Sequence, residues 1–124
     1  MKKIGIYLIK NMETGRTYFG GSTSGIGKKR KQHFQRLRTR KHPNRALQAD
    51  YIKYGHQAFK FEVLHCCSPN QVLEMRFFYI HRFLEVHPKK LLYNSPRGAS
   101  LHGYLPKANI EKTNSHILAN IPTI

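Results

Sequence analysis

Two tyrosines near the start of the chain are the residues best placed to do chemistry. Tyr7 ends the tripeptide Gly-Ile-Tyr at residues 5–7, and Tyr18 opens the tripeptide Tyr-Phe-Gly at residues 18–20. The residues between them include a turn-like segment, Asn-Met-Glu-Thr-Gly, at 11–15. A phenol donates and accepts hydrogen bonds, and glycines let a backbone approach closely. Two tyrosines on paired strands beside glycines indicate a site that handles phosphate.

The charge balance predicts a polyanionic partner. The 124 residues include 22 Lys and Arg but only 6 Asp and Glu, which gives a net charge of +16. Such an excess repels itself and favours binding to a polyanion. Nucleic acid is a better candidate than an anionic membrane, because no predicted helix is amphipathic with a clean aliphatic face. The cations expected to contact nucleic acid are Lys28, Lys31, Arg36, Arg38, Arg40 and Lys41.

The two cysteines, Cys66 and Cys67, are adjacent. Neighbouring cysteines rarely pair, and no second cysteine pair exists that could complete a zinc site. We therefore expect buried, reduced thiols and a cytoplasmic protein, or one of a nucleoid or organelle matrix, rather than a secreted one. No stretch is long enough to predict a membrane span.

Periodicity and turn signals predict six elements in the order β-β-α-α-β-α. The strands are expected at residues 4–10, 16–20 and 59–64, and the helices at 28–38, 45–54 and 68–84. The last helix is expected to start with a capping box, because Ser68 is followed by Pro69 and, three residues on, by Gln71. The pattern predicts an α/β (α+β) fold. A three-stranded, mainly antiparallel sheet is flanked by three helices, in a domain at 1–97 with a loosely structured tail or linker at 98–124.

These motifs, in this order, resemble the GIY-YIG nuclease domain over about residues 4–99, most closely the catalytic domains of phage and intron-encoded homing endonucleases. The matching segments begin with the two tripeptides, the second of which has Phe19 in place of the usual aliphatic residue. The others are the His33-Phe34 pair on the basic helix, His42, residues 47–48, 53–55 and 59–64, and the Tyr93-Asn94 pair. The resemblance implies a metal-dependent endonuclease that hydrolyses phosphodiester bonds of double-stranded DNA. It would use one divalent metal ion, most often Mg²⁺, and no small-molecule cofactor or membrane.

The resemblance also implies roles for the tyrosines and for the residues that complete the site. Tyr7 would activate the attacking water, and Tyr18 would position a phosphate or water. His33 and His42 would assist, and Asn94 would order the site.

An arginine of the first helix grips phosphate in the family. It lies four residues before the histidine, but here that position is Lys29, and the arginine is Arg30. Residues three and four apart share a helix face, so both can reach the neighbourhood of His33. Both stay candidates.

The metal-binding glutamate is a second position at which the chain departs from the family pattern. The metal-binding glutamate lies four residues before an isoleucine, and here Arg76 precedes Ile80 at that spacing. Glu74 lies two residues earlier, and two residues turn a helix by about 200°, so Glu74 and Arg76 cannot face the same spot. Either Glu74 holds the metal after a small helix shift, or Arg76 takes the glutamate's place. In the second case the chain is a catalytically impaired or inactive nucleic-acid-binding module with the same fold.

Overall fold

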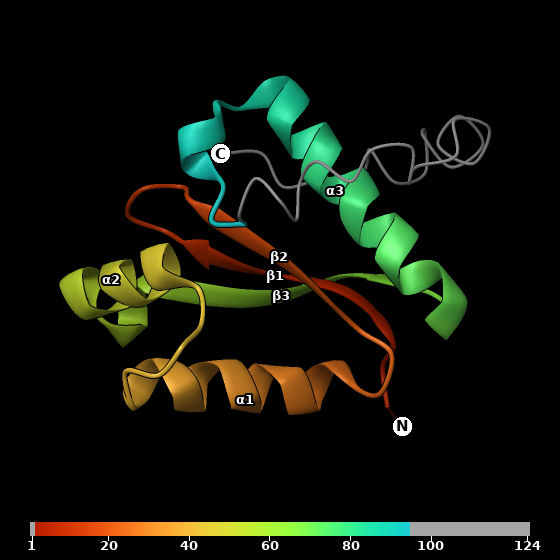
Figure 1. Ribbon diagram of the computed structural model, residues 1–124, viewed down its shortest axis with the longest axis horizontal. Helices are drawn as coiled ribbons and strands as arrows, with labels where there is room; N and C mark the ends of the chain where they lie inside the picture. Colours follow the sequence, from red (N-terminus) through yellow and green to blue (C-terminus); the bar gives the residue numbers. More distant parts are fainter. Residues whose placement is uncertain (1, 95–124) are drawn as a thin grey trace.

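The structure is a computed structural model that describes residues 2–94. Its centre is a three-stranded sheet with the strand order β2-β1-β3 (Figure 1). The strands are β1 (Gly5–Asn11), β2 (Thr17–Ser22) and β3 (Phe59–Cys66), and β1 pairs antiparallel with both neighbours. The predicted sheet is confirmed. The central strand, β1, carries the first tripeptide.

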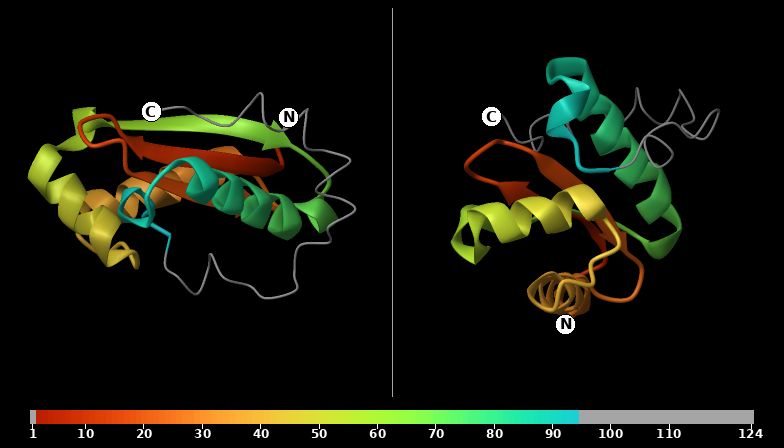
Figure 2. Two further views of the ribbon diagram at one scale, coloured as in Figure 1. Left: turned by 90° about the horizontal axis from the view of Figure 1, so that it is seen from above. Right: turned by 60° about the vertical axis from the view of Figure 1, so that its left-hand side comes forward.

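Three α-helices flank the sheet, as predicted (Figures 1 and 2). They are α1 (Ile26–Arg38), α2 (Arg45–Tyr54) and α3 (Val72–Val86). Asn44 caps α2 by accepting a hydrogen bond from the Leu47 amide at 3.0 Å. The predicted capping box of Ser68 and Gln71 is present, and it starts a 3-10 turn, Pro69–Gln71, directly before α3. Two further 3-10 turns are His56–Ala58 and Lys89–Leu91.

The alternation of β1 divides its side chains between the two faces of the sheet. Ile6 and Leu8 pack with Phe19 and with the buried face of α3. Ile9 packs on the other face, in a second core to which α1 and α2 contribute. All of these side chains are buried, because β1 is covered on both faces. The period of two therefore places Tyr7 on the α1 face, with its ring in contact with His33.

A register shift in the sheet explains the first glycine of the Gly-Ile-Tyr motif. Ile6 pairs with His65, but Tyr7 pairs with Val63, so β3 holds one extra residue between them. Gly5 has φ +151°, and a Cβ atom there would overlap the backbone carbonyl of His65. Only glycine therefore fits where β1 enters the sheet beside this bulge.

The expected burial of the two thiols is wrong. Cys66 is exposed and Cys67 is half-buried, and both are free cysteines. The physical reason is that β3 is an edge strand and Cys66 is its last residue.

None of the helices within residues 2–94 is long and apolar enough to cross a membrane. The predicted domain boundary at residue 97 and the predicted tail at 98–124 lie outside the described residues.

Candidate active site

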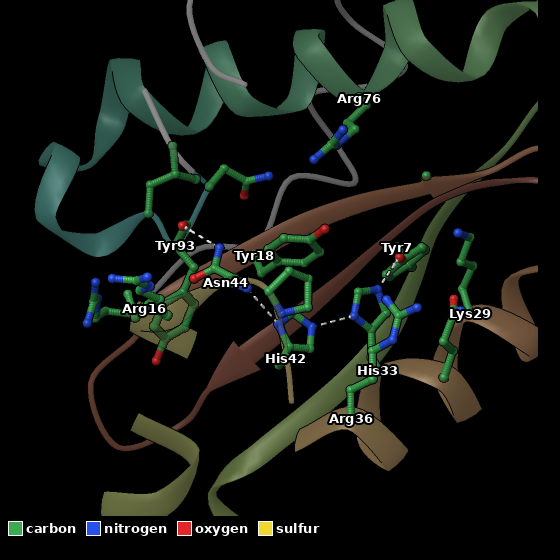
Figure 3. Close-up of a pocket in the computed structure, with 17 residues that line it drawn as sticks. Tyr7, Arg16, Tyr18, Lys29, His33, Arg36, His42, Asn44, Arg76 and Tyr93 are labelled. Atoms are coloured by element: carbon green, nitrogen blue, oxygen red, sulfur yellow. Dashed lines mark hydrogen bonds between the residues drawn. The ribbon is translucent and has the colours of Figure 1, made fainter. Parts of the chain in front are cut away.

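A pocket of about 730 Å³ gathers most of the residues that the resemblance implicates (Figure 3). Among the described residues that line this pocket, Arg30 is the one predicted catalytic residue that is missing. The members that line it are Tyr7, Tyr18, Lys29, His33, His42 and Asn94. They come from β1, β2, α1, the segment before α2 and the segment after α3, so folding is required to bring them together.

Tyr7 is held from three sides. Its ring stacks on Phe61 of β3 with 4.9 Å between centroids, and it meets His33 edge-on at 5.5 Å. The third contact is Gly20, which pairs with Tyr7 across the β1–β2 ladder. A Cβ atom at Gly20 would overlap the Tyr7 ring. The glycine that ends the second tripeptide therefore makes room for the tyrosine that ends the first.

A chain of hydrogen bonds runs from the start of α2 to Tyr7. The Asn44 backbone N–H donates to Nδ1 of His42 at 3.0 Å. Nε2 of His42 lies 2.8 Å from Nδ1 of His33, and Nε2 of His33 lies 2.5 Å from the Tyr7 hydroxyl oxygen (Figure 3). The two imidazole rings stack with centroids 5.1 Å apart.

The backbone N–H of Asn44 sets which partner donates in each of these hydrogen bonds. Because Nδ1 of His42 accepts, a neutral His42 carries its proton on Nε2 and donates it to His33. Nδ1 of His33 is then an acceptor, so the His33 proton lies on Nε2 and is donated to Tyr7. The Tyr7 oxygen therefore accepts from His33, and its own proton is free to be donated elsewhere.

Burial keeps the three hydrogen-bonded side chains, Tyr7, His33 and His42, uncharged at neutral pH. Burial, then the neighbouring His42 and then the cations Lys29, Arg36 and Arg76, lower the pKa of His33 to about 4. Burial also lowers the pKa of His42. Burial and the nearby Tyr18 raise the pKa of Tyr7, although the Arg76 charge acts in the opposite direction.

The structure separates the two candidate phosphate-gripping residues. Lys29 lies one turn before His33 and lines the pocket. Arg30 points to the other side of α1, where its guanidinium lies 5.6 Å from the centre of the Phe61 ring. Arg36, predicted only as a nucleic-acid contact, lines the pocket from the following turn of α1.

The other predicted nucleic-acid contacts, Lys28, Lys31, Arg38, Arg40 and Lys41, are exposed on α1 or just after it and do not line this pocket.

On α3, the residue that reaches the pocket is Arg76. Its Nε donates to the Phe19 carbonyl oxygen at 3.0 Å, and its guanidinium points from α3 towards Tyr18 and Tyr7 (Figure 3). Glu74 is not among the described residues that line the pocket. The assignment of Glu74 as a metal ligand therefore stays a prediction, whereas Arg76 occupies the pocket.

Asn94 joins the segment after α3 to the outer edge of β2. Its Oδ1 accepts from the Phe19 amide at 2.8 Å, and its Nδ2 donates to the Phe19 carbonyl at 2.9 Å. The amide of the preceding Tyr93 donates to the Thr17 carbonyl at 2.8 Å. Asn94 thus closes the site by holding this segment against β2.

The charged side chains in the described walls of the pocket are all cations. They are Arg16, Lys29, Arg36, Arg45 and Arg76. A Mg²⁺ site requires oxygen ligands, usually with at least one carboxylate. Within residues 2–94 no group of three or more His, Cys, Asp and Glu side chains could hold a metal ion. The residues present in this pocket suit an anion and do not fit a divalent metal.

Sequence reasoning missed several pocket residues. Asn44 was open to detection, because Asn is a strong helix N-cap. The sequence around Arg16 contains no motif that would indicate its place in the pocket. Its guanidinium pairs with the Asp50 carboxylate at 3.0 Å and lies over the Tyr93 ring, and the Tyr93 hydroxyl donates to the same carboxylate at 2.7 Å. This network joins the β1–β2 turn, α2 and the segment after α3 beside the pocket.

No family model and no curated protein matches this chain. Two solved structures do match, and both are of the catalytic domain of the intron-encoded homing endonuclease I-TevI; one of them is a glutamate-to-alanine mutant. Each is 29% identical to this chain and covers 74% of it, and the match spans 92% and 97% of those domains. The TM-scores are 0.63 and 0.64. The chain thus has the fold of a homing endonuclease catalytic domain, and its tripeptides at residues 5–7 and 18–20 resemble the two signatures of the GIY-YIG endonuclease superfamily, the second with Phe19 in place of an aliphatic residue.

Proposed function

We propose that this chain is a GIY-YIG endonuclease domain that binds one phosphodiester group of double-stranded DNA in the pocket. In this proposal Arg76 supplies positive charge where other members of the superfamily use a divalent metal ion. The observation that carries the proposal is the guanidinium of Arg76, which enters a pocket whose described charged residues are all cations.

The cations suit a phosphodiester in different ways. Arg76 uses Nε to bind Phe19, and its two terminal nitrogens can form charge-assisted hydrogen bonds to phosphate oxygens. Lys29 offers a point charge from the opposite wall of the pocket. Charge placed in advance around the phosphate stabilises the extra negative charge of the transition state for hydrolysis.

The hydrogen-bond chain gives Tyr7 a defined task. Because His33 donates to its oxygen, the Tyr7 proton is available to a water or a phosphate oxygen in the pocket. The raised pKa of Tyr7 keeps it a neutral phenol at neutral pH. A neutral phenol orients a water molecule but is a weak base. We therefore expect DNA binding to be retained and hydrolysis to be slow.

Arg76 lines the pocket at the spacing where the family has its metal-binding glutamate, and this favours a second candidate function, a nucleic-acid-binding module without hydrolysis. A fully active, metal-dependent enzyme is less well supported, because it requires Glu74 to reach a pocket that it does not line.

Nicking of supercoiled plasmid tests the proposal. The chain, Arg76→Glu and the double variant Tyr7→Phe/Arg76→Glu are compared in Mg²⁺ and in EDTA. We expect the unsubstituted chain to nick slowly, at the same rate in Mg²⁺ and in EDTA. Arg76→Glu should gain Mg²⁺-dependent nicking that the double variant lacks.

Circular dichroism checks that each variant is folded, and Arg76→Ala controls for loss of the arginine alone. Efficient nicking by the unsubstituted chain in Mg²⁺ but not in EDTA would overturn the proposal. The second candidate function would be favoured if the unsubstituted chain bound plasmid but never nicked it.

A further inference from the structure

Helix α1 separates the pocket from a groove on its other side. Two adjacent hollows of about 760 and 750 Å³ lie between α1 and the edge strand β3. Their walls share Gly27, Arg30, Lys31 and Phe61, so they form one groove, which we call the α1–β3 groove. None of the described residues that line it also lines the pocket.

The walls of the α1–β3 groove are strongly basic. Their described charged residues are Lys2, Lys3, Lys28, Arg30, Lys31 and Arg38, and none is a carboxylate. Because these cations follow α1 and the start of the chain, they form a track along the groove rather than a single point. A track of this kind matches the repeating phosphates of a nucleic-acid backbone.

The floor of the groove is aromatic. Phe59 and Phe61 are half-buried on β3, and the buried Phe34 of α1 meets Phe61 edge-on with 6.4 Å between ring centroids. One face of the Phe61 ring stacks on Tyr7, and the exposed Arg30 guanidinium lies 5.6 Å from the ring centre. Half-exposed aromatic rings and a planar guanidinium offer surfaces on which bases stack.

We propose that the α1–β3 groove binds a single-stranded segment of nucleic acid. The cations contact its backbone, and its bases stack against Phe59 and against the Arg30 guanidinium that lies over Phe61. A duplex hides its base faces in its own stack and gains nothing from an aromatic floor, whereas unpaired bases bury apolar surface there. The combination of cations with rings in one hollow therefore favours a single strand over a duplex.

Crosslinking tests this assignment on the unsubstituted chain. An oligothymidylate of about 12 nucleotides, within the usual site size of single-strand-binding folds, carries 5-iododeoxyuridine and is irradiated with the protein. Mass spectrometry then locates the crosslinks. We expect them at Phe59 or Phe61. Crosslinks confined to the pocket tyrosines or to residues 98–124 would overturn the proposal.

Affinity measurements supply an independent readout by fluorescence anisotropy. Phe59→Leu keeps an apolar side chain but removes the ring, and it should weaken oligothymidylate binding about fivefold or more, the loss of one stacked base. Tyr54→Leu, a half-buried aromatic on α2 outside the groove, is the matched control and should leave this affinity unchanged. Equal affinities of Phe59→Leu and the unsubstituted chain would also contradict the proposal.

Two further arms complete the design. In the first, the affinity for oligouridylate is compared with that for oligothymidylate. The oligonucleotide that binds more tightly shows whether the groove prefers RNA or DNA. A short duplex shows whether Phe59→Leu is folded, because its pocket should bind duplex as before. A variant that lost both affinities together would be unfolded, and Arg38→Gln, an exposed change in the same groove, then replaces it. If the α1–β3 groove does not bind a single strand, the result of the plasmid-nicking experiment is unaffected, so the two proposals are tested separately.

Discussion

Arg76 reaches from α3 to the outer edge of β2, where its Nε donates to the carbonyl oxygen of Phe19 at 3.0 Å. The same carbonyl accepts from Nδ2 of Asn94 at 2.9 Å. The guanidinium is therefore held at one end by backbone, and its terminal nitrogens point into the pocket (Figure 3). A cation fixed in place before the ligand arrives loses little conformational entropy on binding phosphate.

The contact between Gly20 and the Tyr7 ring predicts a large effect from one added methyl group. In Gly20→Ala the Cβ atom overlaps the ring, which has no free space because Phe61 and His33 hold its other sides. We expect a loss of about 1–3 kcal/mol in the free energy of unfolding, the usual cost of overpacking. Urea denaturation measures it.

Gly27→Ala is the matched control, because a Cβ atom at Gly27 would meet nothing within 4 Å and the residue lies in α1. Alanine there should stabilise the protein by up to about 1 kcal/mol. Equal effects of the two substitutions would show that the Tyr7 ring is not held against Gly20.

The lowered pKa of His33 predicts that stability falls on acidification. In the unfolded chain His33 takes up a proton near its ordinary pKa of 6.5, but in the folded protein it does so only near about 4. Above pH 6.5 His33 is neutral in both the folded and the unfolded protein, so its titration takes nothing from the free energy of unfolding. Between about pH 6.5 and 4 the unfolded state binds more protons, so the free energy of unfolding decreases, by on the order of 3 kcal/mol in total.

Urea denaturation at several pH values across this window checks the sign. The His33→Gln variant keeps a polar side chain that does not titrate, so its stability should depend less steeply on pH than that of the unsubstituted chain. Identical slopes would mean that His33 titrates normally in the folded protein.

The two hydrogen bonds between Asn94 and Phe19 predict a local change in amide exchange. Phe19 lies on the edge strand β2, and its amide donates to Asn94 Oδ1. Asn94→Ala removes that acceptor, so the Phe19 amide should exchange with solvent faster, and stability should fall by about 1–3 kcal/mol. Hydrogen-exchange NMR follows the amide. The Leu8 amide on the central strand β1 is the internal reference and should change only with global stability.

The sheet and helices could be predicted because local signals and periodicity agree with the final packing. The turn at residues 11–15, the capping box at Ser68 and the apolar face of the third helix each specify their element without help from distant residues. The exposure of Cys66 could not be predicted, because strand order decides which strand lies at the edge. The order of the strands in a sheet depends on contacts between segments that are far apart in sequence.

The site was predictable only in part, for a similar reason. Helix periodicity left Lys29 and Arg30 equivalent, since both positions lie near His33 on a helix. The packing of α1 on the sheet decides between them, with Lys29 in the pocket and Arg30 over Phe61. The direction of the hydrogen bonds from Asn44 through His42 to Tyr7 needed coordinates, because each partner comes from a separate segment.

The central claim is that Arg76 binds a DNA phosphate without a metal ion. The most direct measurement is the affinity of the protein for a short duplex in EDTA, by fluorescence anisotropy, for the unsubstituted chain, Arg76→Gln and Arg82→Gln. Arg82 lies on the same helix and pairs with Glu85 at 2.7 Å, so its substitution removes the same charge outside the pocket.

We expect tight binding by the unsubstituted chain in EDTA. Arg76→Gln should weaken it about tenfold or more, as for loss of a charged hydrogen bond, and Arg82→Gln should change it by less than about twofold. Binding that appears only after Mg²⁺ is added, or equal losses in the two variants, would contradict the account.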